Sequence, residues 1–167
     1  LTALCAPGIS VVTAELADPG FNARFDAKGK RYSYNVLNRG APSPLLANTS
    51  WHVARPLDLD QMKMAAALLV GKHDFVGFRS SDCGRENTVR ELTKVAVDRD
   101  EDLVRVTVEG TAFLKNMVRI IAGTLVDVGR GGMPVERVDK IFETGDRTLA
   151  GQTAPACGLT LEEVFYP

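Results

Sequence analysis

Thr111–Val128, TAFLKNMVRIIAGTLVDV, carries the strongest periodic signal in this chain of 167 residues. An apolar residue recurs at every fourth position, which predicts one long amphipathic helix with a stripe of Phe113, Met117, Ile121 and Leu125. The stripe is widened by Leu114, Val118 and Val128. This helix is the most secure helical element that the sequence indicates.

Two cations of the same stretch, Lys115 and Arg119, are four residues apart, so we expect them to share the helix face opposite the apolar stripe. A solvated helix surface is the ordinary interpretation of such a pair. The sharper one is that Arg119 uses its planar guanidinium to pair with a carboxylate or phosphate from another element. Gly123 lies one turn beyond Arg119 and would leave room for a neighbouring backbone.

The remaining elements indicate an α+β protein. Alternating valines predict a β-hairpin, the most secure local element, and Asp60 is a plausible N-cap for a helix that ends at Gly71. The expected strands are residues 9–15, 31–37, 89–97, 103–109 and 159–166, the further helices are 60–70 and 134–142, and the longer connections are 40–57 and 72–87. In the strand at 31–37, Tyr32 and Tyr34 fall on one face and Arg31 on the other.

Composition excludes several classes of protein. The net charge of −1 argues against a uniformly basic nucleic-acid surface, so any polyanion site must be local. No apolar run is long enough to span a bilayer. Three widely separated cysteines without a C-x-x-C pair fit reduced thiols in a cytoplasmic protein, and we expect no metal site and no membrane association.

One segment, Phe21–Val36 (FNARFDAKGKRYSYNV), concentrates aromatic and basic side chains. Its tyrosines are more often core residues than stacking platforms. Interleaved aromatics and cations are nevertheless what single-stranded or looped RNA requires, since rings stack on bases and cations meet phosphates.

The loop RSSDCGR, Arg79–Arg85, places Asp82 beside Cys83. Neither His52 nor His73 forms part of a catalytic or metal-binding pattern that would activate this thiol, so a surface loop is the better interpretation.

Four segments together resemble the tRNA pseudouridine synthase A family in their order and spacing. They are FNARFDAKGKRYSYNV, HDFVGFRSSD, TAFLKNMVRIIAGTLVDVGRG and DRTLAGQTAPACGLTLEEVFYP. The resemblance runs through essentially the whole chain. It implies a pseudouridine synthase fold, with a mixed, mostly antiparallel sheet and helices packed on one face. Residues 1–167 would be its single C-terminal domain.

What the resemblance implies about activity is specific. The family isomerises uridine to pseudouridine in the tRNA anticodon arm, at positions thirty-eight to forty, without a cofactor and as a homodimer. Its catalytic aspartate lies in a G-R-T-D-A-G motif that this sequence lacks, and the setting of Asp82 does not match that motif. We therefore expect a fragment whose N-terminal domain, with the aspartate, is absent; the lack of an initiator Met fits this view. The isolated chain would be inactive.

The family motifs also map onto individual residues. Tyr32 matches the active-site tyrosine that stacks on the target base, Arg119 the partner of the catalytic aspartate, and Leu159 part of the apolar wall. Contacts to the anticodon arm of tRNA, mostly to phosphate, are expected from Arg24, Lys28, Lys30, Arg31, Arg79 and Lys115, and Asn116 is a further candidate RNA contact. Lys115-Asn116 replaces a His-His pair of many relatives. The alternatives are a non-catalytic RNA-binding domain and a structural dimerisation domain.

Overall fold

The computed structural model describes residues 2–5 and 7–167. A six-stranded sheet runs in the order β2-β1-β5-β4-β3, with β6 also pairing with β1. The strands are β1 (Gly29–Leu37), β2 (Trp51–His52), β3 (Gly71–Asp74), β4 (Val89–Asp100), β5 (Leu103–Gly110) and β6 (Leu159–Phe165). Only the β1–β2 pairing is parallel, so the predicted mixed, mostly antiparallel sheet is confirmed.

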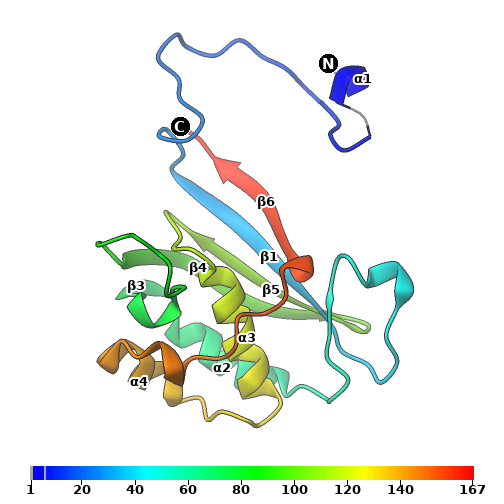
Figure 1. The fold of residues 1–167 in the computed structure, drawn as a ribbon, viewed down its shortest axis with the longest axis vertical. Coiled ribbons are helices and arrows are strands. Elements are labelled where there is room, and N and C mark those ends of the chain that lie inside the picture. The colour runs from blue at the N-terminus through cyan, green and yellow to red at the C-terminus, as the bar shows by residue number, and fades with distance from the viewer. Residues whose placement is uncertain (1, 6) are drawn as a thin grey trace.

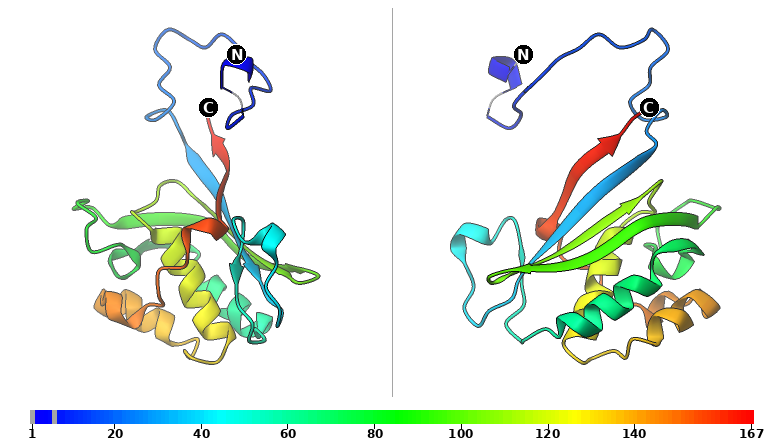
Figure 2. Two further views of the ribbon diagram at one scale, coloured as in Figure 1. Left: turned by 45° about the vertical axis from the view of Figure 1, so that its right-hand side comes forward. Right: turned by 180° about the vertical axis from the view of Figure 1, so that it is seen from behind.

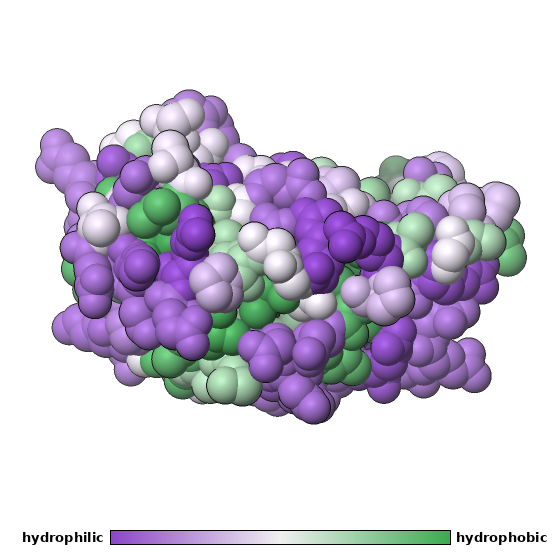
Figure 3. Space-filling view, turned by 90° about the horizontal axis from the view of Figure 1, so that it is seen from below, coloured by the Kyte–Doolittle hydropathy of each residue, from purple (hydrophilic) through white to green (hydrophobic). Residues whose placement is uncertain are grey.

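The helices α2 (Leu59–Leu68), α3 (Met117–Gly129) and α4 (Arg137–Thr144) lie together on one face of this sheet, as predicted. Figure 1 and both views of Figure 2 show them beneath the strands, with β1 and β6 projecting beyond the helical layer. The short helix α1 (Thr2–Cys5) lies away from this body. Seen from below in Figure 3, the helical side is mainly hydrophilic, with hydrophobic residues showing between the polar ones.

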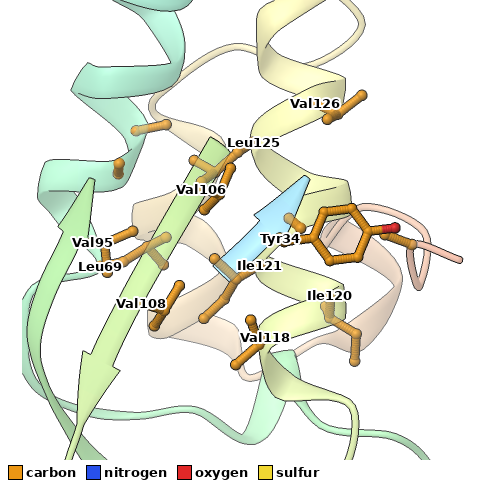
Figure 4. Packing of buried hydrophobic residues seen from close by; sticks show 14 of the residues in the cluster. Tyr34, Leu69, Val95, Val106, Val108, Val118, Ile120, Ile121, Leu125 and Val126 are labelled. Carbon is orange, nitrogen blue, oxygen red and sulfur yellow. The ribbon is translucent and has the colours of Figure 1, made fainter. Parts of the chain in front are cut away.

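The core forms between the helices and the inner face of the sheet. Figure 4 shows Val106 and Val108 of β5 facing Ile121 and Leu125 of α3. All four side chains are fully buried. The predicted hairpin and the predicted strand at 31–37 are confirmed, and their alternation supplies this inner face, because successive strand residues point to opposite sides.

Helix α3 differs from its prediction in two ways. It begins at Met117 and not at Thr111, because Asn116 takes a left-handed conformation at φ 61° that ends the preceding turn. It also has no solvated face: Arg119 and Asp127 are its only residues that are not buried. Lys115 therefore precedes the helix, and the expectation that it shares a helix face with Arg119 is wrong.

Other boundaries were also misplaced. Residues 9–15 form no strand, and Ile9 and Val12 are exposed; β-branched residues make a strand only where a neighbouring strand and a surface to pack on are available. The N-cap of α2 is Asp58, whose Oδ1 accepts hydrogen bonds from two backbone amides at 3.0 Å, and not Asp60. Strand β3 occupies the start of the expected loop, and α4 begins three residues after the expected position, at Arg137.

The connection after α4 crosses the helical layer. Residues 150–155, here called the strap, pass directly over α3, and a Cβ atom added to Gly123 would lie 1.9 Å from the carbonyl oxygen of Gln152. Gly151 of the strap is also too close for a side chain, since its own Cβ would lie 2.5 Å from the Thr124 nitrogen. The expectation that Gly123 makes room for a neighbouring backbone is confirmed.

Gly123→Ala is expected to lower the free energy of unfolding by about 1–3 kcal/mol. Alanine favours a helix by about 1 kcal/mol over glycine. This gain cannot offset the clash of the added methyl group with the backbone of the strap. Urea unfolding measures the change. Gly40→Ala is the matched control, because no atom lies within 4 Å of its added Cβ. An equal or higher stability of Gly123→Ala would contradict the close approach.

Candidate active site

A pocket of about 120 Å³ opens where β1, β6 and the start of α3 meet. It is lined by Tyr32, Phe113, Leu114, Asn116, Met117, Val118, Arg119 and Leu159. The three residues that the sequence placed in the active site come from three different elements, and the fold brings all of them to this one pocket. Its wall is largely apolar, with a guanidinium at one side.

Tyr32 is half-buried on β1 and meets the pocket with its ring. Phe113 packs edge-on against it, with ring centroids 5.1 Å apart and ring planes at 79°. Such an arrangement fixes the orientation of both rings while leaving faces free for a third ring. Burial raises the pKa of the Tyr32 hydroxyl above its ordinary value, so it is protonated at neutral pH.

Arg119 lies in the first turn of α3, and two hydrogen bonds orient its guanidinium. Its Nε donates to the carbonyl of Ala154 at 2.7 Å, and its Nη1 donates to Oδ1 of Asn116 at 3.0 Å. No carboxylate of the described residues forms an ion pair with it. A half-buried cation that faces a pocket and has only neutral acceptors is well arranged to receive an anion.

The strap also holds the backbone of Arg119. Besides accepting from Nε, Ala154 donates its backbone amide to the carbonyl of Arg119 at 3.1 Å. The strap is anchored in turn by Arg147, whose Nη1 reaches the Gly151 carbonyl at 2.9 Å, and by Thr124, whose hydroxyl oxygen accepts from the Gly151 amide at 2.9 Å. The guanidinium of Arg119 is therefore held in place before any ligand binds.

Leu159 reaches the pocket because the chain turns sharply before it. Gly158 passes so close to β1 that an added Cβ would lie 2.7 Å from the ring of Tyr34 and from the carbonyl of Asn35. Strand β6 begins directly afterwards, with Leu159 opposite Tyr34. The hydroxyl of Tyr34 donates to the carbonyl of Pro155 at 2.6 Å, which ties the strap to the sheet.

The predicted RNA contacts on β1 are divided between the two faces of the sheet. Lys30 is on the face of Tyr32. Arg31 is on the opposite face, where it pairs with Glu109 at 2.8 Å and Glu163 at 2.7 Å, so the fold does not bring it to the pocket. The hydrogen bond that Arg31 donates to Glu109 is the main reason that the pKa of Arg31 is raised. Its role in RNA binding remains a prediction.

The other predicted contacts differ in where they lie. Asn116 lines it directly, whereas Lys115 is exposed and pairs with Asp82. This pairing lowers the pKa of the Asp82 carboxyl, which does not line the pocket. Arg24 and Lys28 are exposed just before β1, and Arg79 is half-buried and donates to the backbone carbonyl of Arg85 at 2.8 Å.

Sequence reasoning missed one pocket residue of consequence. Phe113 was assigned to the apolar stripe of a helix, but it precedes α3 and turns its ring toward Tyr32. The signal that could have found it is the polar Lys115-Asn116 pair just before the long apolar run, because asparagine tolerates the left-handed conformation that ends a turn.

Two further expectations concern metals and membranes. Across residues 2–5 and 7–167, no three His, Cys, Asp or Glu side chains gather in a way that could hold a metal ion. Within the same part of the chain, no helix combines the length and apolarity needed to cross a membrane. All three cysteines are free thiols.

Comparison with known proteins defines the class to which this fold and pocket belong. The sequence profile of the family described as tRNA pseudouridine synthase matches residues 65–167. This chain belongs to the tRNA pseudouridine synthase family, as the resemblance of its motifs predicted.

Several curated relatives carry the name tRNA pseudouridine synthase A. The protein from Myxococcus xanthus is 48% identical over 99% of this chain and 63% of its own length. The one from Pelobacter propionicus is 47% identical over 95% of this chain and 65% of its own length, and the one from Geotalea uraniireducens is 46% identical over 99% and 68%. The chain thus spans about two thirds of the length of these relatives.

Burial of the two tyrosines on β1 leads to a prediction about pH. Because burial raises the pKa of both hydroxyls in the folded protein, the unfolded chain, whose tyrosines titrate near pH 10, loses protons first as pH rises. The free energy of unfolding is therefore expected to fall above about pH 10. Urea unfolding from pH 8 to pH 11 measures this loss, and Tyr34→Phe should make it smaller. An unchanged slope in that variant would contradict the burial argument.

Proposed function

We propose that the complete protein containing this chain isomerises uridine to pseudouridine in tRNA, and that the pocket of Tyr32, Arg119 and Leu159 is its uracil site. The observation that carries the proposal is the convergence of these three residues on one pocket. The name that the relatives carry supports the same activity. No organic cofactor is required in this proposal.

The chemistry of the pocket suits a nucleotide that has left its stack. A flipped uracil loses stacking on its neighbours, and an aromatic ring replaces it with about 1–3 kcal/mol per base. Tyr32 offers such a ring, held by Phe113, and Leu159 closes the apolar side. The protonated hydroxyl of Tyr32 is a candidate for proton transfer at the base.

Arg119 supports the second half of the proposal, which is an aspartate supplied by a segment outside this chain. That carboxylate would pair with the guanidinium of Arg119 and attack the flipped nucleotide. A permanently charged guanidinium favours the ionised form of a nearby carboxylate and so keeps its pKa low. On this proposal the 167 residues alone are catalytically inactive.

We further propose the anticodon arm of tRNA, at positions thirty-eight to forty, as the substrate, a cytoplasmic location, and a homodimer. A two-fold symmetric assembly could extend a local basic surface on each subunit and so accommodate a net charge of −1. The proposed RNA contacts are those that the sequence predicted, of which Asn116 lines the pocket itself.

Arg119→Ala in the complete protein is expected to lower the rate of pseudouridine formation by about a hundredfold or more, because a pair between the guanidinium and the incoming carboxylate would be lost. Tyr32→Phe should keep the ring and its stacking and test the hydroxyl alone. The measurement is pseudouridine formed in an unmodified tRNA transcript. Lys63→Gln, on the exposed side of α2, is the control.

Circular dichroism and urea unfolding of the same variants separate lost activity from lost structure. Wild-type activity of a folded Arg119→Ala protein would overturn the assignment of Arg119 as the carboxylate partner. If the complete wild-type protein binds tRNA but forms no pseudouridine, the non-catalytic RNA-binding domain is the better assignment. If it neither binds nor modifies tRNA, the dimerisation domain is.

A further inference from the structure

A second hollow lies beside the pocket, on the same face of the sheet, and we call it the basic groove. It has a volume of about 390 Å³ and is lined by Arg24, Phe25, Ala27, Lys30, Arg85, Arg90, Thr111, Ala112 and Phe113. Phe113 lines both the groove and the pocket, and Lys30 is two residues before Tyr32 on the same face of β1. A strand that placed one base against Tyr32 would therefore have its neighbouring backbone at this groove.

The charge of the groove is of one sign. Four of its lining residues are cations and none is acidic. None of these four forms an ion pair with a carboxylate of the described residues. In a chain with 20 basic and 21 acidic residues, four cations with no acidic residue among the lining are a local excess of positive charge. A groove of one sign concentrates a ligand of the opposite sign.

The opposite face of the sheet provides the contrast. The hollow there is lined by Arg31, Ser33, Arg105, Thr107, Glu162 and Glu163, so that each cation has a carboxylate near it. Arg31 is bound to two glutamates. Arg31 on that face is thus already neutralised within the protein, whereas no cation of the basic groove forms an ion pair with a carboxylate of the described residues.

Arg90 gives an independent indication of a ligand site. Its Nη1 donates to the carbonyl of Val89 at 2.6 Å, but its Nε is buried and has no hydrogen-bond partner. Buried donors are nearly always paired, so an unpaired N–H of a guanidinium in a basic groove points to an external acceptor. Guanidinium groups match the oxygens of a phosphate especially well.

We infer that the basic groove is a phosphate site in which Arg85, Arg90 and Lys30 hold the RNA backbone next to the nucleotide in the pocket. Arg85 and Arg90 were given no role by the sequence. The inference rests on the proposed function for the identity of the strand, but its chemistry requires only a polyanion. Contacts of this kind position the strand and do not select its bases.

The test uses the complete protein, an unmodified tRNA transcript, and the variants Arg85→Gln and Arg90→Gln. Each is expected to weaken binding by about ten- to hundredfold, because a hydrogen bond to a charged group is lost. Each should also make the slope of log affinity against log salt shallower by about one phosphate contact. The KM for tRNA should rise while kcat at saturating tRNA stays near the wild-type value.

The choice of variants gives the test a clear outcome in two ways. Arg85 is exposed, so Arg85→Gln should fold even where the half-buried Arg90→Gln does not. Arg137→Gln, on α4, is the matched control and should leave the salt slope unchanged. Wild-type salt slopes in folded Arg85→Gln and Arg90→Gln proteins would overturn the inference, as would an equal change in Arg137→Gln.

The outcomes also separate this inference from the proposed function. If the wild-type protein forms no pseudouridine but Arg85→Gln still reduces the salt slope of RNA binding, the proposed function fails and the phosphate site stands. If the wild-type protein forms pseudouridine and neither variant changes the salt slope, the phosphate site fails and the proposed function stands.

Discussion

The contact between the strap and α3 is the constraint on which the candidate site depends. Backbone meets backbone there because Gly123 and Gly151 have no side chains, and any Cβ at either position would enter the other segment. Protein interiors deform little, so this contact fixes the distance between the two segments. The carbonyl of Ala154 is consequently held where Arg119 can donate to it, and the chain leaves the strap in the direction that puts Leu159 at the pocket.

The cations of the chain differ in whether a carboxylate of the protein balances their charge. Arg31, on the face of the sheet opposite the pocket, is matched with two carboxylates, those of Glu109 and Glu163. Arg119 and the cations of the basic groove are not, and they lie at two adjoining hollows. Retaining unpaired charge at a partly buried position opposes folding unless a ligand or another segment supplies the counter-charge. The proposed carboxylate and the proposed RNA phosphates would supply it at the two sites.

Much of the fold could be predicted because local patterns have local causes. Alternating valines defined β4 and β5, and the R-Y-S-Y-N-V-L alternation defined β1, since one face of each strand had to be buried. The predictions of secondary structure were wrong where contacts with other segments determine the local conformation. Residues 9–15 have the composition of a strand but form none, and α3 begins only at Met117, because the left-handed backbone of Asn116 ends the preceding turn.

The sequence by itself determined the family and the sheet with helices on one face, and it predicted Tyr32, Arg119 and Leu159 as site residues, because periodicity and family motifs can be read from the order of the residues alone. Only the tertiary structure decided that these three share a pocket, that Phe113 faces Tyr32, that Arg31 lies on the other side of the sheet, and that Arg85 and Arg90 join Lys30 in one groove. The physical reason is that convergence and charge pairing depend on distances between segments remote in sequence, which packing sets and local patterns do not encode.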